Sequence, residues 1–185
     1  MVKYRRYNIP GGTYFFTVTL QDRKSNYLTK YIKQLGEAMR HVKRIHPFKI
    51  IAMVVLPDHL HAMWELPEND ANFSLRWRCI KISFAAQIKK CGITVKKNQY
   101  NENLLWQRRF WEHAIRNEKD YEQHVNYIHY NPVKHNLVKR VSDWPYSTFH
   151  QYVKEGILLA NWSAALVLNR TYDQLNYLYG ILNFG

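Results

Sequence analysis

Runs of apolar residues along the chain predict several β-strands. Residues 13–20 are rich in β-branched and aromatic side chains, which are typical of a strand. Residues 48–56 are almost continuously apolar, so we expect a second strand at the centre of the sheet. A Pro-Asp turn leads from it directly into a strand that begins at His59, and strands joined this tightly pair as an antiparallel hairpin. A further strand is expected within residues 106–115.

Helical spacing of apolar residues predicts three amphipathic helices between and after these strands. The first covers residues 29–46 and ends before Pro47, and the second covers residues 73–91. The third begins after Asn117, a suitable N-cap, and we expect Pro132 to stop it. The length of the chain and its apolar content predict one compact domain with a substantial core.

Two histidines, His59 and His61, lie one residue apart at the start of the second hairpin strand. Because side chains alternate across a strand, both imidazoles face one side, while Leu60, Ala62 and Trp64 face the other and can pack against helices. A pair of histidines on one face is half of a metal site. A lone His-x-His is common, however, and by itself it is as consistent with a structural role.

The third predicted helix carries two stripes about a quarter-turn apart. The apolar stripe consists of Tyr121, Val125 and Ile128, and the second stripe consists of His124, Tyr127 and Asn131. Tyr130 falls opposite the apolar stripe and is expected to face water. Tyr127 and Asn131, one turn apart, are therefore expected at the margin between core and solvent, where a side chain can reach over a sheet. A tyrosine at the edge of the core is the structural alternative.

The charge of the chain indicates a polyanionic partner. Its 185 residues include 27 Lys and Arg against 14 Asp and Glu, a net charge of +13. Nucleic acid is the first expectation and an anionic membrane the second. No apolar run approaches the roughly 20 residues of a spanning helix, so we expect a soluble, cytoplasmic protein without membrane association. Cys79 and Cys91 fit neither a disulfide framework nor a zinc site and are expected to be reduced and buried.

These features together favour phosphoryl transfer. Two strand-borne imidazoles and one oxygen ligand from a helix can hold Mg²⁺ or Mn²⁺ and leave positions open for phosphate oxygens. Tyr127 is the candidate nucleophile, because attack by its phenolic oxygen would conserve the energy of a broken phosphodiester in a phosphotyrosine bond. No small-molecule cofactor is expected.

Several motifs occur in an order and spacing that match a known family. They are Gly12-Thr13, Leu56-Pro57-Asp58-His59-Leu60-His61, Trp106-Gln107, Phe110-Trp111-Glu112-His113, Tyr127-Ile128-His129-Tyr130-Asn131-Pro132-Val133-Lys134-His135 and Ser142-Asp143-Trp144-Pro145-Tyr146-Ser147. The chain thereby resembles the REP-associated tyrosine transposases, single-tyrosine relatives of the insertion-sequence transposases with a His-hydrophobe-His motif. The resemblance extends from about Tyr4 to His150.

This resemblance implies a ferredoxin-like antiparallel β-sheet flanked by α-helices. His59 and His61 would bind the metal, Asn131 would complete the site, and Tyr127 would form a 5′-phosphotyrosine on single-stranded DNA and leave a free 3′-OH. The substrate would be an imperfect palindromic hairpin, REP-like, with a short flanking tetranucleotide. The protein would thus be a metal-dependent endonuclease and strand transferase, cytoplasmic and associated with the nucleoid.

Basic and turn residues supply the candidate nucleic-acid contacts. They are Lys3, Tyr4, Arg5, Arg6, Gly12, Thr13, Arg76, Arg78, Arg108, Arg109 and Lys134. For the helical and loop residues among them, an ordinary solvated charged face is the competing interpretation. A non-catalytic module that binds structured DNA or RNA through the same basic face is the alternative to the enzyme.

The sequence also predicts how the chain is divided. Residues 1–152 form the expected single-tyrosine catalytic domain, and residues 153–185 form a C-terminal tail that could pack on it, mediate dimerisation or cover the site. A monomer and a homodimer both remain open. Two positions depart from the family pattern: Tyr14 replaces a frequent Trp, and Asn136 replaces a frequent Gly, which Asn tolerates because it can adopt the left-handed conformation.

Overall fold

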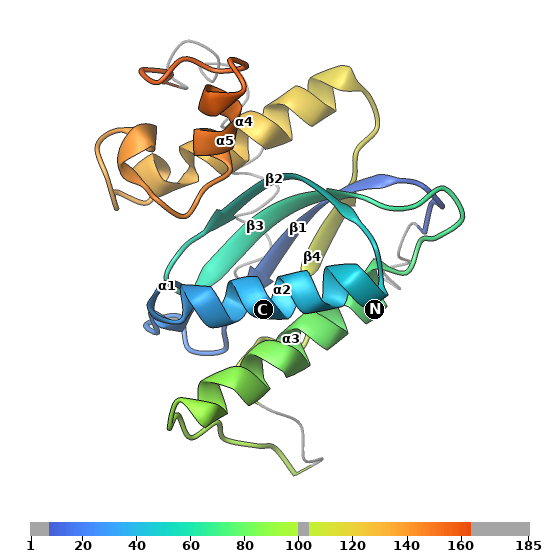
Figure 1. Ribbon diagram of the computed structural model, residues 1–185, viewed down its shortest axis with the longest axis vertical. Coiled ribbons are helices and arrows are strands. Elements are labelled where there is room, and N and C mark those ends of the chain that lie inside the picture. The colour runs from blue at the N-terminus through green and yellow to red at the C-terminus, as the bar shows by residue number, and fades with distance from the viewer. Residues whose placement is uncertain (1–7, 100–103, 164–185) are drawn as a thin grey trace, which may run out of the picture. The chain divides into compact units, whose positions relative to one another are not determined.

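The computed structural model describes residues 8–99 and 104–163. The chain divides into two compact units, the first ending at Ile115 and the second beginning at Arg116. All four strands belong to the first unit, and the described part of the second unit is helical (Figure 1). The predicted boundary near residue 152 stays a prediction, and most of the predicted C-terminal tail, residues 164–185, lies outside the described residues.

The first unit has the strand and helix order of a ferredoxin-like fold. Its elements are β1 (Thr13–Thr19), α1 (Tyr27–Lys30), α2 (Ile32–Ile45), β2 (Lys49–Val55), β3 (His59–Glu65), α3 (Phe73–Lys90) and β4 (Trp111–Ala114). The strands pair antiparallel in the order β2-β3-β1-β4, which places β1 and β3 at the centre. The predicted α+β class with an antiparallel sheet and flanking helices is confirmed.

Helices α2 and α3 pack against each other on one face of this sheet (Figure 1). The side chains between sheet and helices are largely aromatic: Trp64 of β3 stacks on Trp77 of α3 with ring centroids 4.2 Å apart, and the centroid of the Phe48 ring lies 4.1 Å from that of Trp64. Leu60, Ala62 and Trp64 are all buried. The prediction that these three residues of β3 form a face that packs against helices is therefore confirmed.

The prediction that the apolar strand within residues 48–56 is central was wrong. This strand, β2, lies at the edge of the sheet, and a register shift between Ile50 and Ala52 interrupts its pairing with β3. Strand β3 is central and is buried along almost its whole length. An apolar run indicates burial by neighbouring layers, whereas strand order depends on where the crossover connections lead the chain.

Three other local predictions needed correction. The helix expected over residues 29–46 is divided into α1 and α2 at Tyr31, and its last apolar residue, Ile45, is 58% exposed. The two cysteines are free, as expected, but Cys79 is only half-buried and Cys91 is exposed. Their position along a predicted helix did not reveal which face each would occupy.

The second unit contains α4 (Glu118–Lys134), the short 3₁₀ helix η1 (Val141–Asp143) and α5 (Phe149–Lys154). The Asn117 side chain accepts a hydrogen bond of 2.9 Å from the Asp120 backbone, so the predicted N-cap is confirmed. Pro132 lies inside α4 and does not stop it. Its missing N–H costs one hydrogen bond, but only half a turn remains before the helix ends.

Asn136 terminates α4 in the left-handed conformation, with φ of 55°. The backbone N–H groups of Asn136 and Leu137 donate to the carbonyls of Val133 and Pro132, the pattern of a Schellman cap. The predicted left-handed conformation of Asn136 is thus confirmed. Within residues 8–99 and 104–163, none of the helices has the length and apolar character required to span a bilayer.

Candidate active site

The two strand histidines lie side by side on the sheet face opposite α2 and α3. The turn between β2 and β3 makes His59 the first residue of β3, and the Leu56 backbone N–H closes this turn on the His59 carbonyl. The centroids of the His59 and His61 rings are 5.0 Å apart. Both side chains are buried, at 5% and 3% exposure. The predicted pair of imidazoles on one face is therefore present.

Each of these imidazoles has a fixed partner at Nδ1. His59 Nδ1 lies 2.8 Å from Asp58 Oδ1, and His61 Nδ1 lies 2.9 Å from Thr17 Oγ1. Thr17 reaches His61 because it is paired directly opposite that residue in the β1–β3 ladder. An engaged Nδ1 fixes the ring orientation and makes Nε2 the atom that would bind a metal, which is the arrangement that metal-binding histidines ordinarily have.

The charge on Asp58 determines the tautomer of His59. Burial alone would raise the pKa of the Asp58 carboxyl, but the His59 hydrogen bond and the charges of His59 and Arg23 together hold this pKa below its usual value. An ionised carboxylate only accepts hydrogen bonds, so His59 carries its proton on Nδ1. The lone pair of neutral His59 is then on Nε2. The two imidazoles therefore fit the donor set expected for a divalent metal ion.

Tyr127 and Asn131 lie one turn apart on α4, as predicted, but both are buried rather than at a solvent margin, at 3% and 0% exposure. Burial raises the pKa of Tyr127 to about 12, and an interaction with the Asn131 side chain opposes this shift. Among the described residues, neither polar atom of the Asn131 amide has a hydrogen-bond partner of good geometry. A buried amide in this state is unusual and has an oxygen available as a ligand.

Lys134, predicted to contact nucleic acid, lies beside the tyrosine. Its Nζ is 3.4 Å from Tyr127 Oη and 4.8 Å from the centre of the ring. Burial lowers the pKa of the Lys134 ammonium. Two turns of helix separate these residues in sequence, which is the spacing that brings side chains onto one face. The sequence therefore contained the information that Lys134 is near the candidate nucleophile.

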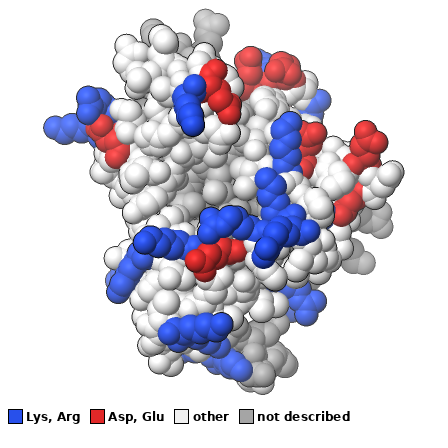
Figure 2. Space-filling view, in the orientation of Figure 1, with Lys and Arg blue, Asp and Glu red and all other residues white. Residues whose placement is uncertain are grey.

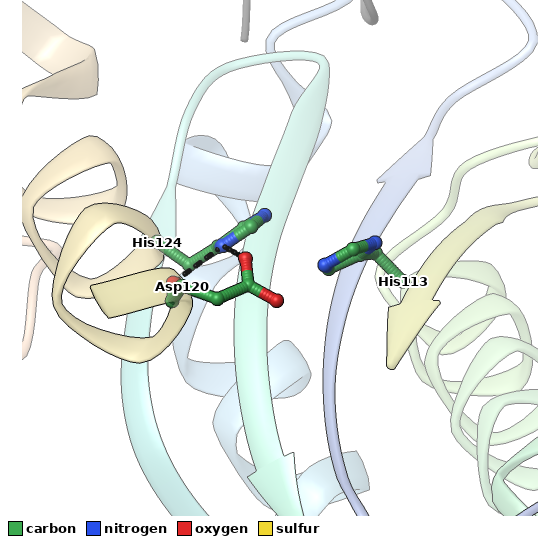
Figure 3. Close-up of side chains that lie close together, drawn as sticks. All are labelled: His113, Asp120 and His124. Atoms are coloured by element: carbon green, nitrogen blue, oxygen red, sulfur yellow. Dashed lines mark hydrogen bonds and ion pairs between the residues drawn. The ribbon is translucent and has the colours of Figure 1, made fainter. Parts of the chain in front are cut away.

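A second pair on α4 was not recognised from the sequence as an interaction. His124 Nδ1 lies 3.0 Å from Asp120 Oδ1 and 2.8 Å from the Asp120 carbonyl oxygen. Figure 3 shows these two side chains in contact on one turn of α4. The i, i+4 spacing of an acid and a histidine on a predicted helix was the feature from which this pair could have been found.

The candidate nucleic-acid residues differ in accessibility. Arg78, Arg108 and Arg109 are exposed, and Gly12 and Thr13 lie at the start of β1 beside a turn in which Gly11 has φ of 69°. Lys3, Tyr4, Arg5 and Arg6 lie outside the described residues.

Arg76 does not lie on the polar, solvent-facing side of its helix, where it was expected. It is 1% exposed, and its guanidinium donates to the Pro47 carbonyl and to Asp70. A buried arginine satisfied in this way fastens the start of α3 to the segment that leads into β2. We therefore leave Arg76 out of any DNA interface.

Comparison with known proteins identifies the family. Residues 11–131 match the model of a family described as "Transposase IS200 like". The chain is 53% identical over 163 residues to the REP-associated tyrosine transposase of Escherichia coli K12, covering 88% of this chain and 92% of that protein. A related protein of Haemophilus influenzae is 48% identical over 164 residues, covering 88% of this chain and 93% of the relative.

A solved structure agrees with these relatives. It is described as a REP-associated tyrosine transposase bound to a REP hairpin, and it matches with a TM-score of 0.78 and 53% identity, covering 88% of this chain and 92% of that one. The fold, the motif order and these relatives lead to one conclusion. This chain belongs to the IS200-like transposases, DNA-acting enzymes, and within them to the REP-associated tyrosine transposases.

Proposed function

We propose that this chain is a metal-dependent single-stranded DNA endonuclease and strand transferase that acts on palindromic hairpins through a covalent phosphotyrosine. The observation that carries the proposal is the orientation of His59 and His61, whose Nδ1 atoms are both engaged and whose Nε2 atoms are thereby assigned to a metal. The choice of a hairpin substrate rests on the related transposase, 53% identical, that was solved with a REP hairpin.

His59, His61 and Asn131 are the residues that would hold the ion, with Mg²⁺ or Mn²⁺ as the candidates. Two imidazoles and an amide oxygen suit Mn²⁺ or Mg²⁺ better than a thiolate-preferring metal. When bound, the ion would supply charge neutralisation at the scissile phosphate. Asp58 and Thr17 keep the two imidazoles in the required tautomer and orientation, so the protein does not have to reorder them when it binds the ion.

Tyr127 is the proposed nucleophile. Its Oη forms a bond to phosphorus while the bond from phosphorus to the 3′ oxygen breaks, which leaves the 5′ phosphate on the enzyme. The phenolic proton departs and the 3′ oxygen takes up a proton, so the products are a 5′-phosphotyrosine and a 3′-OH. Attack by a 3′-OH on the phosphotyrosine reverses these bond changes and rejoins DNA.

The environment of Tyr127 requires proton loss to accompany attack. With the pKa of Tyr127 raised to about 12, the phenol is neutral near pH 7, so no preformed phenolate is available. The Lys134 ammonium, 3.4 Å from Oη, would stabilise negative charge that develops on that oxygen. Lys134 is then a residue of the reaction centre, in addition to its predicted contact with DNA.

The remaining predicted residues are assigned to DNA binding. Arg78, Arg108 and Arg109 are exposed and suited to phosphate contacts, and Gly12 and Thr13 present backbone close to a strand end. We extend the same role to the basic N-terminal segment, residues 3–6. We assign the catalytic domain to residues 1–152 and propose that the enzyme works at the nucleoid in the cytoplasm, where its DNA substrate is found.

The test is a denaturing-gel assay of protein incubated with Mn²⁺ and a labelled single-stranded hairpin with flanking sequence. We expect a protein-linked DNA band that disappears with chelator and with Tyr127→Phe, while hairpin affinity is nearly unchanged in that variant. Tyr130→Phe, on the same helix, is the matched control and should retain the band.

Two results would overturn the proposal. A linked band that persists in Tyr127→Phe would show that another residue is the nucleophile. Tight hairpin binding without any linked band would instead favour a non-catalytic module for structured DNA or RNA.

A further inference from the structure

An open groove of about 1070 Å³ lies between α2 and α3, on the sheet face opposite His59 and His61. Its lining consists mainly of polar and charged side chains from both helices. Ala86 of α3 and Cys91, which follows α3, also line it. The active-site proposal makes no use of this groove. Because α2 packs against α3, and α3 packs on the sheet through Trp77 and Trp64, the two walls of the groove are held together.

The groove is strongly basic. Arg40, Lys43 and Arg44 of α2 and Lys90 of α3 line it, against a single acidic residue, Glu37. All four cations are exposed, and none makes an ion pair with any residue of the described part of the chain. Figure 2 shows Lys and Arg side chains in a band across the middle of the view, where Figure 1 places α2. Unpaired cations on facing walls create a positive potential that attracts a polyanion.

The arrangement of these cations suits a phosphate backbone. Arg40 and Arg44 are one turn apart, so a rise of 1.5 Å per residue separates them by about 6 Å along α2, which is comparable to the spacing of phosphates along a strand. Gly36, one turn before Arg40, has no side chain, and a Cβ there would lie 3.2 Å from Arg40 Nη1. A glycine inside a helix costs about 1 kcal/mol relative to alanine, and here it lets the guanidinium lie back along the helix.

We propose that the groove between α2 and α3 is a second DNA-binding surface, which holds the phosphodiester backbone of the substrate without reading its sequence. This inference rests on the proposed function for its substrate. No Phe, Tyr or Trp side chain lines the groove, and His41 contributes a single ring, so the groove offers no extended platform on which successive bases could stack. Its contacts would position DNA, and recognition of sequence would belong to other residues.

The charge of the groove argues against a second copy of this chain as its occupant. In a symmetric dimer the same patch meets itself, so four cations would face four cations. An anionic membrane would also neutralise these cations, but a membrane surface is flat. A concave groove contacts a flat surface less extensively than it contacts a strand of DNA.

The experiment compares two quadruple variants. The groove variant carries Arg40→Gln, Lys43→Gln, Arg44→Gln and Lys90→Gln. The matched control carries Lys33→Gln, Lys119→Gln, Lys139→Gln and Lys154→Gln, four exposed lysines outside the groove. Hairpin affinity is measured by fluorescence anisotropy at several salt concentrations, for a palindromic hairpin and for one of scrambled sequence. Covalent linkage is measured at saturating DNA.

Counterion release sets the size of the expected effect. Loss of four phosphate contacts reduces the slope of log affinity against log salt by about 2.8 to 3.6. Between about 50 and 200 mM salt, wild-type affinity should therefore fall roughly 50- to 150-fold more than that of the groove variant. We expect this change for both hairpins and little change in the control. The linkage rate at saturating DNA should be retained.

Each other outcome has a definite meaning. Equal slopes in groove and control variants would overturn the groove while leaving Tyr127-dependent linkage intact. If the groove variant keeps the wild-type salt dependence of DNA binding but has an altered sedimentation coefficient, that result would overturn the proposal in favour of a second copy of the chain. The same salt dependence with lost binding to vesicles containing phosphatidylserine would overturn it in favour of a membrane. Absence of linkage in wild type would instead contradict the proposed function, and the affinity comparison would still test the groove.

An exposed thiol inside the groove provides a second measurement. Cys91 lines the groove, and a Cys79→Ala background leaves it as the reactive cysteine. Alkylation of Cys91 by N-ethylmaleimide should slow at least severalfold when hairpin DNA saturates the protein. An unchanged alkylation rate would contradict DNA binding in the groove.

Discussion

Replacement of Thr17 by valine tests whether the strand register prepares His61 for a metal. Valine has nearly the shape of threonine and suits a strand, so the substitution removes the hydroxyl at 2.9 Å from His61 Nδ1 and little else. Without that partner the ring can rotate, and its neutral form can place the proton on Nε2. We therefore expect weaker metal binding through the loss of orientation.

The magnitude follows from the role of such partners at metal sites. Loss of a hydrogen bond that orients a histidine typically costs about 10- to 100-fold in metal affinity, or about 1.4 to 2.7 kcal/mol. We expect Mn²⁺ to bind Thr17→Val at least tenfold more weakly than wild type, as measured by isothermal titration calorimetry. Asp58→Asn should have a comparable effect through His59, because an amide is a weaker acceptor than a carboxylate.

The same strand provides a matched control. Thr19 lies on the same face of β1, opposite His59, and its side chain makes no hydrogen bond with any described residue. Thr19→Val should bind Mn²⁺ within about twofold of wild type. Unchanged Mn²⁺ affinity in Thr17→Val, or an equal loss in Thr19→Val, would refute the argument that the Thr17 hydroxyl orients the ligand.

Three further predictions concern stability and are measured by urea unfolding. Burial lowers the pKa of His129 from 6.5 to about 4. The unfolded chain therefore takes up this proton first, and the stabilisation from neutral His129, about 3 kcal/mol at most, is complete above pH ~6.5 and is lost as the pH falls toward 4. His129→Gln should flatten that loss, and curves parallel to wild type would contradict the assignment. Arg76→Met should reduce the free energy of unfolding by about 3 kcal/mol, because the Pro47 carbonyl and Asp70 lose their partner. A loss below about 1 kcal/mol would mean that water replaces the guanidinium. Asn117→Ala should cost about 1 kcal/mol through loss of the α4 cap, with Asn117→Asp nearly neutral, and equal losses in both variants would exclude the cap as the cause.

The proposed nucleophile Tyr127 and the Lys134 cation beside it belong to one helix. The geometry of this proposed nucleophile and cation pair is therefore set by α4 itself. Pro132 lies between the two residues in sequence, and it fixes the backbone in that turn. The helix thus holds the Tyr127 phenol and the Lys134 ammonium on one rigid element, as the proposed role of both residues requires.

The sequence alone determined the features that depend on local periodicity. Alternation in β3 placed His59 and His61 on one face, the Asn117 cap began α4, and Asn136 ended it in the left-handed conformation. These features need only a few neighbouring residues, because side-chain direction and capping are set within one or two turns or a single strand.

The tertiary structure alone decided what depends on residues far apart in the chain. Strand order placed β2 at the edge, and the β1–β3 register brought Thr17 to His61. Packing of α3 buried Arg76, and the pairing of α2 with α3 gathered their cations into one groove. No local pattern encodes these outcomes, because each depends on which surfaces meet when the core closes.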